Sequence, residues 1–211
     1  MSHTKQRRSP FPAVVALLAL GVCGVLVASG GARAEEAAPP AGLKGEVLTW
    51  FKDAESKLID LAEVTPESTY AWRPGTDVRS TGEVFMHVAS ANYGIPGLWG
   101  VKPPEGYDMA TFEKSKTRKA DIVATLKASF AHMEKAWTST SDADLEKPID
   151  LFGTKTTMRG GYLLLLSHCH EHLGQSIAYA RMNRIVPPWT ARQQAAAAAK
   201  KAEVKAAPVK K

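Results

Sequence analysis

Apolar residues recur at helical spacing in four long segments of this chain, and that periodicity constrains the fold more than any other feature. The segments span about 43–64, 80–94, 117–137 and 157–183. Within each segment, apolar residues return every three to four positions, as on the buried face of an amphipathic helix. No long stretch alternates as a half-buried strand does. The sequence therefore predicts an all-α protein, a four-helix bundle whose helices run alternately up and down.

Helix start and stop signals separate the four segments. Ser80 to Glu83 has the S-x-x-E pattern of a capping box and predicts the start of the second helix. Pro187 with Pro188 predicts the end of the fourth helix, because proline cannot continue a helix. Residues 151–153 could form an extended segment or a short hairpin before the fourth helix.

Residues 1–34 have the order of segments found in a secretory signal peptide. A basic head at 5–8 precedes an apolar run at 11–28, and Ala32-Arg33-Ala34 has the small-x-small pattern of a cleavage site. We expect cleavage after Ala34, a periplasmic or secreted protein, and no stable membrane anchor after cleavage. The apolar run is nearly long enough to cross a bilayer, so an uncleaved anchor stays open as an alternative.

These features divide the chain into three parts. They are a signal peptide at 1–34, a bundle domain at 42–189 and an Ala/Lys-rich tail at 190–211, which we predict to be disordered. The net charge of +6 comes from the two ends, because 17 basic and 20 acidic residues remain when 1–34 and 190–211 are set aside. Since this remainder has a net charge of −3, we expect no nucleic-acid partner.

Two histidines of the last predicted helix share one helical face. His168 and His172 are four residues apart, which places their rings one turn apart on the same side. His87 in the second predicted helix can add a third imidazole from a facing helix. Three such ligands hold a divalent metal and leave a coordination position for water or substrate. His170 lies about 200° around the helix from either neighbour, so we exclude it as a ligand.

Other residues near this pair could support the site. Gln175 lies on the same face and could orient a ligand or a bound water, or it could be a polar residue at the mouth of the bundle. A loop carboxylate such as Asp108 or Glu105 could add a fourth ligand. Cys169 lies off the shared face, and we expect a small, half-buried apolar residue there rather than a ligand.

Two segments of the chain resemble the DinB-like superfamily, whose members carry a three-histidine metal site. One runs from Tyr70-Ala71-Trp72-Arg73-Pro74 to Glu83-Val84-Phe85-Met86-His87-Val88, and the other is His168-x3-His172-x2-Gln175, followed by Tyr179 and Arg181. The resemblance covers about 43–189 and implies a four-helix bundle. It also implies that His87 on the second helix and His168 and His172 on the fourth hold a divalent metal. Characterised relatives include thiol-cofactor-dependent isomerases and S-transferases, so the resemblance implies a metal-dependent enzyme.

The predicted site allows more than one function. A metal-dependent enzyme would be a hydrolase or a thiol-linked transferase that acts on a small-molecule substrate of unknown identity. A non-catalytic metal-binding or stress-response module is the alternative, and a metal-free bundle with polar core histidines is a third. Zinc is the metal we expect, while imidazole ligands leave nickel, iron and manganese as alternatives. The sequence also leaves a homodimer open.

Overall fold

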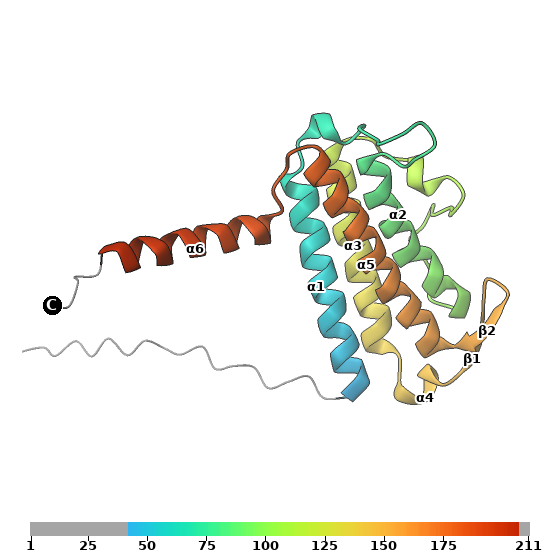
Figure 1. Cartoon of the computed structure of the whole chain (residues 1–211). Helices are drawn as coiled ribbons and strands as arrows, with labels where there is room; N and C mark the ends of the chain where they lie inside the picture. Colours follow the sequence, from blue (N-terminus) through green and yellow to red (C-terminus); the bar gives the residue numbers. More distant parts are fainter. Residues whose placement is uncertain (1–41, 207–211) are drawn as a thin grey trace, which may run out of the picture. The chain divides into compact units, whose positions relative to one another are not determined.

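The computed structural model describes residues 42–206, and its long segments are helices (Figure 1). The elements in chain order are α1 (Gly42–Val64), η1 (Glu67–Thr69), α2 (Thr81–Gly94), η2 (Ile95–Trp99), η3 (Phe112–Lys114), α3 (Lys119–Ser139), α4 (Asp142–Leu145), β1 (Pro148–Leu151), β2 (Thr154–Thr157), α5 (Met158–Met182) and α6 (Pro188–Ala206). The four predicted helices correspond to α1, α2, α3 and α5, so the all-α fold class is confirmed. The predicted signal peptide at 1–34 lies outside the described residues.

Apolar side chains from the four long helices meet in one core. Among the largest are Phe51 and Leu58 of α1, Phe85 and Met86 of α2, Phe130 and Trp137 of α3, and Tyr162 and Leu165 of α5. Burial of a side chain of this size contributes about 1.5–3 kcal/mol to stability. The predicted capping box is also present, because the Ser80 and Glu83 side chains each accept a hydrogen bond from the other residue's backbone NH. Core and cap together fix α2 and α5, the two helices that carry the predicted metal ligands.

The order of helix directions differs from the predicted up-and-down arrangement. The start of α3 lies at the end of α1, where the Lys119 ammonium donates to the Glu63 carbonyl over 2.7 Å. The end of α3 lies at the start of α1, where the Trp137 indole donates to the Lys44 carbonyl over 3.1 Å. Helix α3 therefore runs antiparallel to α1 and in the same direction as α2, as Figure 1 shows. The connection at 95–118 makes this order feasible, because it is long enough to return the chain to the end where α2 begins.

A two-stranded hairpin precedes α5, which is the second of the alternatives left open for residues 151–153. Strands β1 and β2 pair antiparallel with Leu151 opposite Thr154. Phe152 and Gly153 form the turn with φ values of 55° and 86°, as in a type I′ turn. The Asp150 carboxylate accepts a hydrogen bond from the Gly153 NH over 2.6 Å. These contacts fix the shape of the hairpin tip.

Residues 190–206 are helical, whereas we predicted a disordered tail at 190–211, of which 207–211 lie outside the described residues. Helix α6 spans Pro188–Ala206, and residues 191–205 are exposed. Trp189 at the start of α6 packs against the core, and Arg192 pairs with Asp60 of α1 over 3.3 Å. Alanine and lysine have high helix propensity and proline is favoured in the first turn, so local preference accounts for the rest of this helix. Of the helices within residues 42–206, none combines the length and apolarity needed to cross a bilayer.

Candidate metal centre

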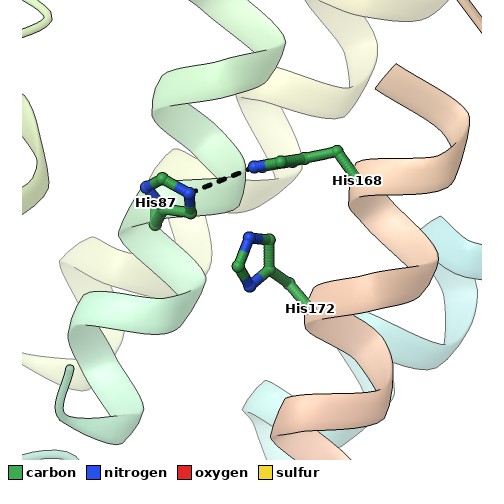
Figure 2. A group of neighbouring side chains, drawn as sticks. All are labelled: His87, His168 and His172. Carbon is green, nitrogen blue, oxygen red and sulfur yellow. Dashed lines mark hydrogen bonds between the residues drawn. The ribbon is translucent and has the colours of Figure 1, made fainter. Parts of the chain in front are cut away.

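Helices α2 and α5 face each other and bring the three predicted histidines together (Figure 2). His87 projects from α2, while His168 and His172 project from successive turns of α5. The ring centroids lie 4.9 Å apart for His87 and His168, 4.6 Å for His87 and His172, and 4.4 Å for His168 and His172. One potential ligand atom from each residue lies within 4.8 Å of the others. The three side chains could therefore hold a single metal ion.

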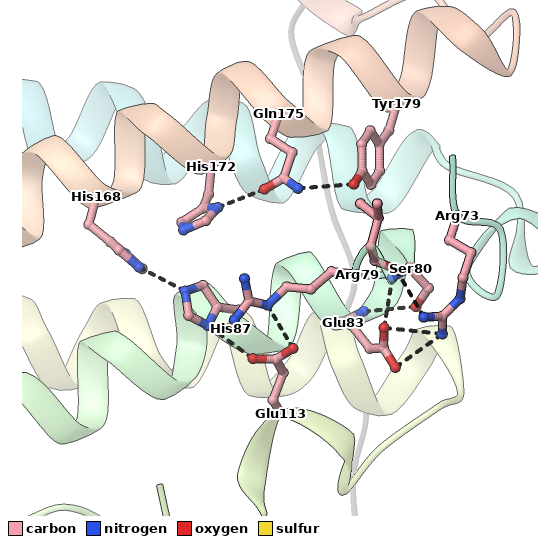
Figure 3. Close-up of polar contacts among 11 residues, drawn as sticks. Arg73, Arg79, Ser80, Glu83, His87, Glu113, His168, His172, Gln175 and Tyr179 are labelled. Carbon is pink, nitrogen blue, oxygen red and sulfur yellow. Dashed lines mark hydrogen bonds and ion pairs between the residues drawn. The ribbon is translucent and has the colours of Figure 1, made fainter. Parts of the chain in front are cut away.

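Gln175 contacts the outer nitrogen of His172. The Gln175 amide NH₂ donates to the Tyr179 hydroxyl over 3.0 Å, which turns the amide oxygen towards His172 (Figure 3). That oxygen lies 2.8 Å from His172 Nδ1 and can only accept, so Nδ1 carries the proton. Nε2 of His172 is then the atom with a free lone pair. Gln175 thus orients a potential ligand, which is one of the roles considered for it, and its participation in metal binding stays a prediction.

Glu113 orients His87 in the same way, and no sequence pattern indicated this contact. Its carboxylate Oε2 lies 3.0 Å from His87 Nδ1, and its Oε1 accepts a hydrogen bond from Arg79 Nε over 2.7 Å. Figure 3 shows Glu113 between the imidazole and the guanidinium. A carboxylate paired with arginine accepts, so Nδ1 of His87 is protonated and Nε2 is free. Outer contacts of this type orient metal-binding histidines and raise their basicity.

His168 completes the group and is partly buried, whereas His172 is the buried member of the three. His168 Nε2 lies 3.1 Å from His87 Nε2, and because the latter is unprotonated, the proton between the two rings belongs to His168. Its Nδ1 is buried and has no hydrogen-bond partner among the described residues. Burial is the largest cause that lowers the pKa of His87 and of His168, and the pKa of His168 falls to about 3. Both rings are therefore neutral at physiological pH, which is the form that binds metals.

The other predicted candidates lie outside this group. His170 Nδ1 lies 2.9 Å from the Leu166 carbonyl of its own helix. Asp108 and Glu105 are exposed, and the structure does not bring either of them into the histidine cluster within residues 42–206. Cys169 is fully rather than half buried, and burial raises the pKa of its thiol to about 12. At neutral pH it is therefore a core thiol rather than a thiolate ligand or nucleophile.

The family model of the DinB superfamily matches residues 51–176, which is more than half of the chain. This segment contains all three histidines and Gln175. The chain belongs to the DinB superfamily. The resemblance predicted from the sequence is thereby confirmed.

Solved structures support the DinB fold. A DinB-like protein from Bacillus cereus ATCC 10987 is 20% identical, with a TM-score of 0.60 over 67% of this chain and 93% of that chain. A DinB-like protein from Bacillus subtilis is 21% identical, with a TM-score of 0.54 over 67% of this chain and 94% of that chain. No curated protein matches the sequence.

A pocket opens beside the histidines of this DinB-superfamily protein. Its volume is about 420 Å³, and His87 and His168 form part of its wall. Arg79, Glu113 and Glu171 line it with charged groups. Small-molecule sites have volumes of about 300–1,000 Å³, so the pocket has room for a compact ligand. Its position gives such a ligand direct access to two of the three imidazoles.

The three imidazoles of His87, His168 and His172 are chemically suited to hold a divalent metal. Two of the three imidazoles have the outer nitrogen held by an acceptor, from Gln175 and from Glu113. A metal would take the place of the proton that lies between His87 and His168, so loading would shift or release a proton. Imidazole nitrogens suit several first-row transition metals, and zinc is among them.

Proposed function

We propose that this protein is an exported, metal-dependent enzyme of DinB type that holds a divalent ion through His87, His168 and His172. The observation that carries the proposal is the convergence of three imidazoles, two of which, His87 and His168, form part of a pocket wall. Three protein ligands beside an accessible space are typical of a reactive site, whereas structural zinc sites use four. The proposed metal is zinc, with nickel, iron and manganese as alternatives.

Hydrolysis of a small molecule and thiol-linked transfer are the two reactions we propose. A divalent ion at this site would act as a Lewis acid that lowers the pKa of a coordinated water or thiol, or polarises a substrate oxygen. The protein's own contribution is orientation. Glu113 and Gln175 hold His87 and His172 in the tautomers that present Nε2. Arg79 keeps Glu113 in place and adds a positive charge at the pocket wall.

A non-catalytic metal-binding module is the second candidate function. A binding module has no need of space beside its metal, whereas an enzyme needs a cleft with polar groups directed into it. The pocket beside His87 and His168 favours the enzyme.

Cobalt substitution tests the choice between an open and a closed site, because the visible spectrum of cobalt responds to coordination number and ligand type. We expect azide and a small thiol each to change the spectrum of the cobalt-loaded protein. His170→Ala should give the same spectral response, since the His170 ring is hydrogen-bonded to the Leu166 carbonyl of its own helix. A spectrum that no added ligand changes would indicate a closed structural site and would remove the enzyme proposal.

Export is the second part of the proposal, and it is supported by the signal-peptide pattern of residues 1–34. We expect the mature protein in the periplasm or the medium to begin at Glu35. Mass spectrometry of protein recovered from those fractions measures its N-terminus. An intact leader in the membrane fraction would show that the apolar run is an anchor.

A further inference from the structure

The pocket beside the histidines has a second side, which is apolar. Its lining includes Ala91, Ile95, Met109, Phe152 and Leu164. They come from four different parts of the chain, namely α2, the segment after it, the hairpin tip and α5. Ala91 lies one helical turn after His87 and Leu164 one turn before His168, and α2 and α5 run in opposite directions, so both apolar residues lie to the same side of the imidazoles. Such a division matches a ligand that has a polar head and an apolar body.

Phe152 is an unusual residue at the tip of the hairpin. Its φ of 55° is in the left-handed region, where asparagine, aspartate and glycine are favoured and a bulky side chain is disfavoured. Its ring is nevertheless 64% exposed, so the ring is not held there by core packing. Phe152 forms part of the pocket wall. Neither turn preference nor core packing accounts for a bulky apolar residue at this position, whereas contact with a ligand would.

Two more apolar side chains of the same wall are exposed. Met109 is 47% exposed and Leu164 is 40% exposed. Together with Phe152 they form an accessible apolar rim next to the histidines. Water at such a rim is displaced favourably by an apolar ligand, with a free energy that grows with the area covered.

We propose that this pocket binds a small amphipathic molecule, with a metal-binding head at His87 and His168 and an aliphatic or aromatic body against Phe152, Met109 and Leu164. The inference rests on the proposed metal function for the head group, and it adds the class of substrate. The apolar body is recognised by the rim, and none of the rim residues is one of the three histidines. Head and body can therefore be tested separately.

Alkyl hydroxamates of increasing chain length are the probe, from acetohydroxamate to octanohydroxamate. The hydroxamate head binds divalent metals, and only the tail differs along the series. We expect the affinity for the cobalt-loaded protein to rise by up to about fourfold for each methylene that the rim covers. An affinity that does not depend on tail length would overturn the proposal.

Three variants test where the alkyl tail of the hydroxamate binds. Phe152→Asn removes the ring and places a favoured residue at φ 55°, so the protein should remain folded. Leu164→Gln changes a rim residue, and Leu163→Gln is its matched control, because Leu163 is 43% exposed but is not in the pocket wall. Phe152→Asn and Leu164→Gln should each weaken octanohydroxamate about fivefold to tenfold and leave acetohydroxamate unchanged. Leu163→Gln should leave both unchanged, and a loss equal to that of Leu164→Gln would contradict the assignment.

Titration of the metal-free protein separates this proposal from the metal proposal. Octanohydroxamate should still bind more tightly than acetohydroxamate, and Phe152→Asn should reduce that difference about fivefold to tenfold, as in the cobalt-loaded protein. If no metal binds but the tail preference remains, the metal function fails and the apolar subsite stands. If acetohydroxamate changes the cobalt spectrum but neither form of the protein prefers a longer tail, the metal site stands and the amphipathic ligand is refuted.

Discussion

Replacement of Glu113 should weaken metal binding without removing any of the three histidines. Its carboxylate lies 3.0 Å from His87 Nδ1 and 2.7 Å from Arg79 Nε. In Glu113→Ala, His87 loses the acceptor that orients it, and the Arg79 guanidinium stays beside the site without its partner. Loss of an outer contact of this kind typically lowers metal affinity about 10–100-fold, equivalent to about 1.4–2.7 kcal/mol.

The loss of the acceptor for His87 and the loss of the charge partner of Arg79 should be separable by a second substitution at the same position. Glu113→Gln keeps an oxygen that can accept from Nδ1 but removes the negative charge opposite Arg79. We therefore expect a loss near the lower end of the range for Glu113→Gln and near the upper end for Glu113→Ala. The side chain of Glu113 is 22% exposed, so solvent screens part of the charge effect.

Competition with a chromophoric zinc chelator measures these affinities on metal-free protein. Glu171→Ala is the matched control, because Glu171 is an exposed carboxylate of the same pocket that lies outside the histidine cluster. Circular dichroism should show unchanged helix content in all three variants. Wild-type affinity in Glu113→Ala, or an equal loss in Glu171→Ala, would refute the role we assign to Glu113.

Three further results are expected from measurements that need no substrate. Gln175→Ala should lower zinc affinity about tenfold in the same competition assay, because His172 Nδ1 loses its acceptor, and wild-type affinity would contradict this. Leu58→Ala should reduce the free energy of unfolding by about 2–5 kcal/mol in urea titrations, because Leu58 is fully buried. Leu163→Ala, at an exposed position, should change it by less than about 1 kcal/mol. In the chain that begins at Glu35, Cys169 is the only thiol, and it is buried. It should therefore react with a disulfide reagent only as fast as the protein unfolds, and fast labelling of the folded protein would contradict its burial.

Most of the fold that could be predicted from the sequence depends on local patterns. Helical periodicity and capping depend on residues a few positions apart, so the four long helices were placed to within one or two residues. The pairing of His168 with His172 is equally local, because four residues make about one helical turn. Placing His87 opposite them required two helices to pack face to face, and the family resemblance supplied that pairing.

Features that depend on the path of the connections were not predictable in this way. The segment 95–118 has no helical periodicity, so the sequence did not indicate that it returns the chain and sets α3 parallel to α2. Glu113 lies in this segment and reaches His87 across 26 positions of sequence. The helix at 188–206 was not predicted for a different reason, since most of it is favoured by intrinsic propensity and no apolar face marks it.

Metal content per chain is the most direct test of the central claim that three histidines hold one divalent ion. Protein purified from the cells that produce it, or loaded with zinc and freed of excess, should contain about one ion per chain by elemental analysis. His87→Ala, His168→Ala and His172→Ala should each lose most of it, whereas His170→Ala should retain it. A protein that binds no stoichiometric metal, or a loss in His170→Ala equal to that of the other three variants, would contradict the account.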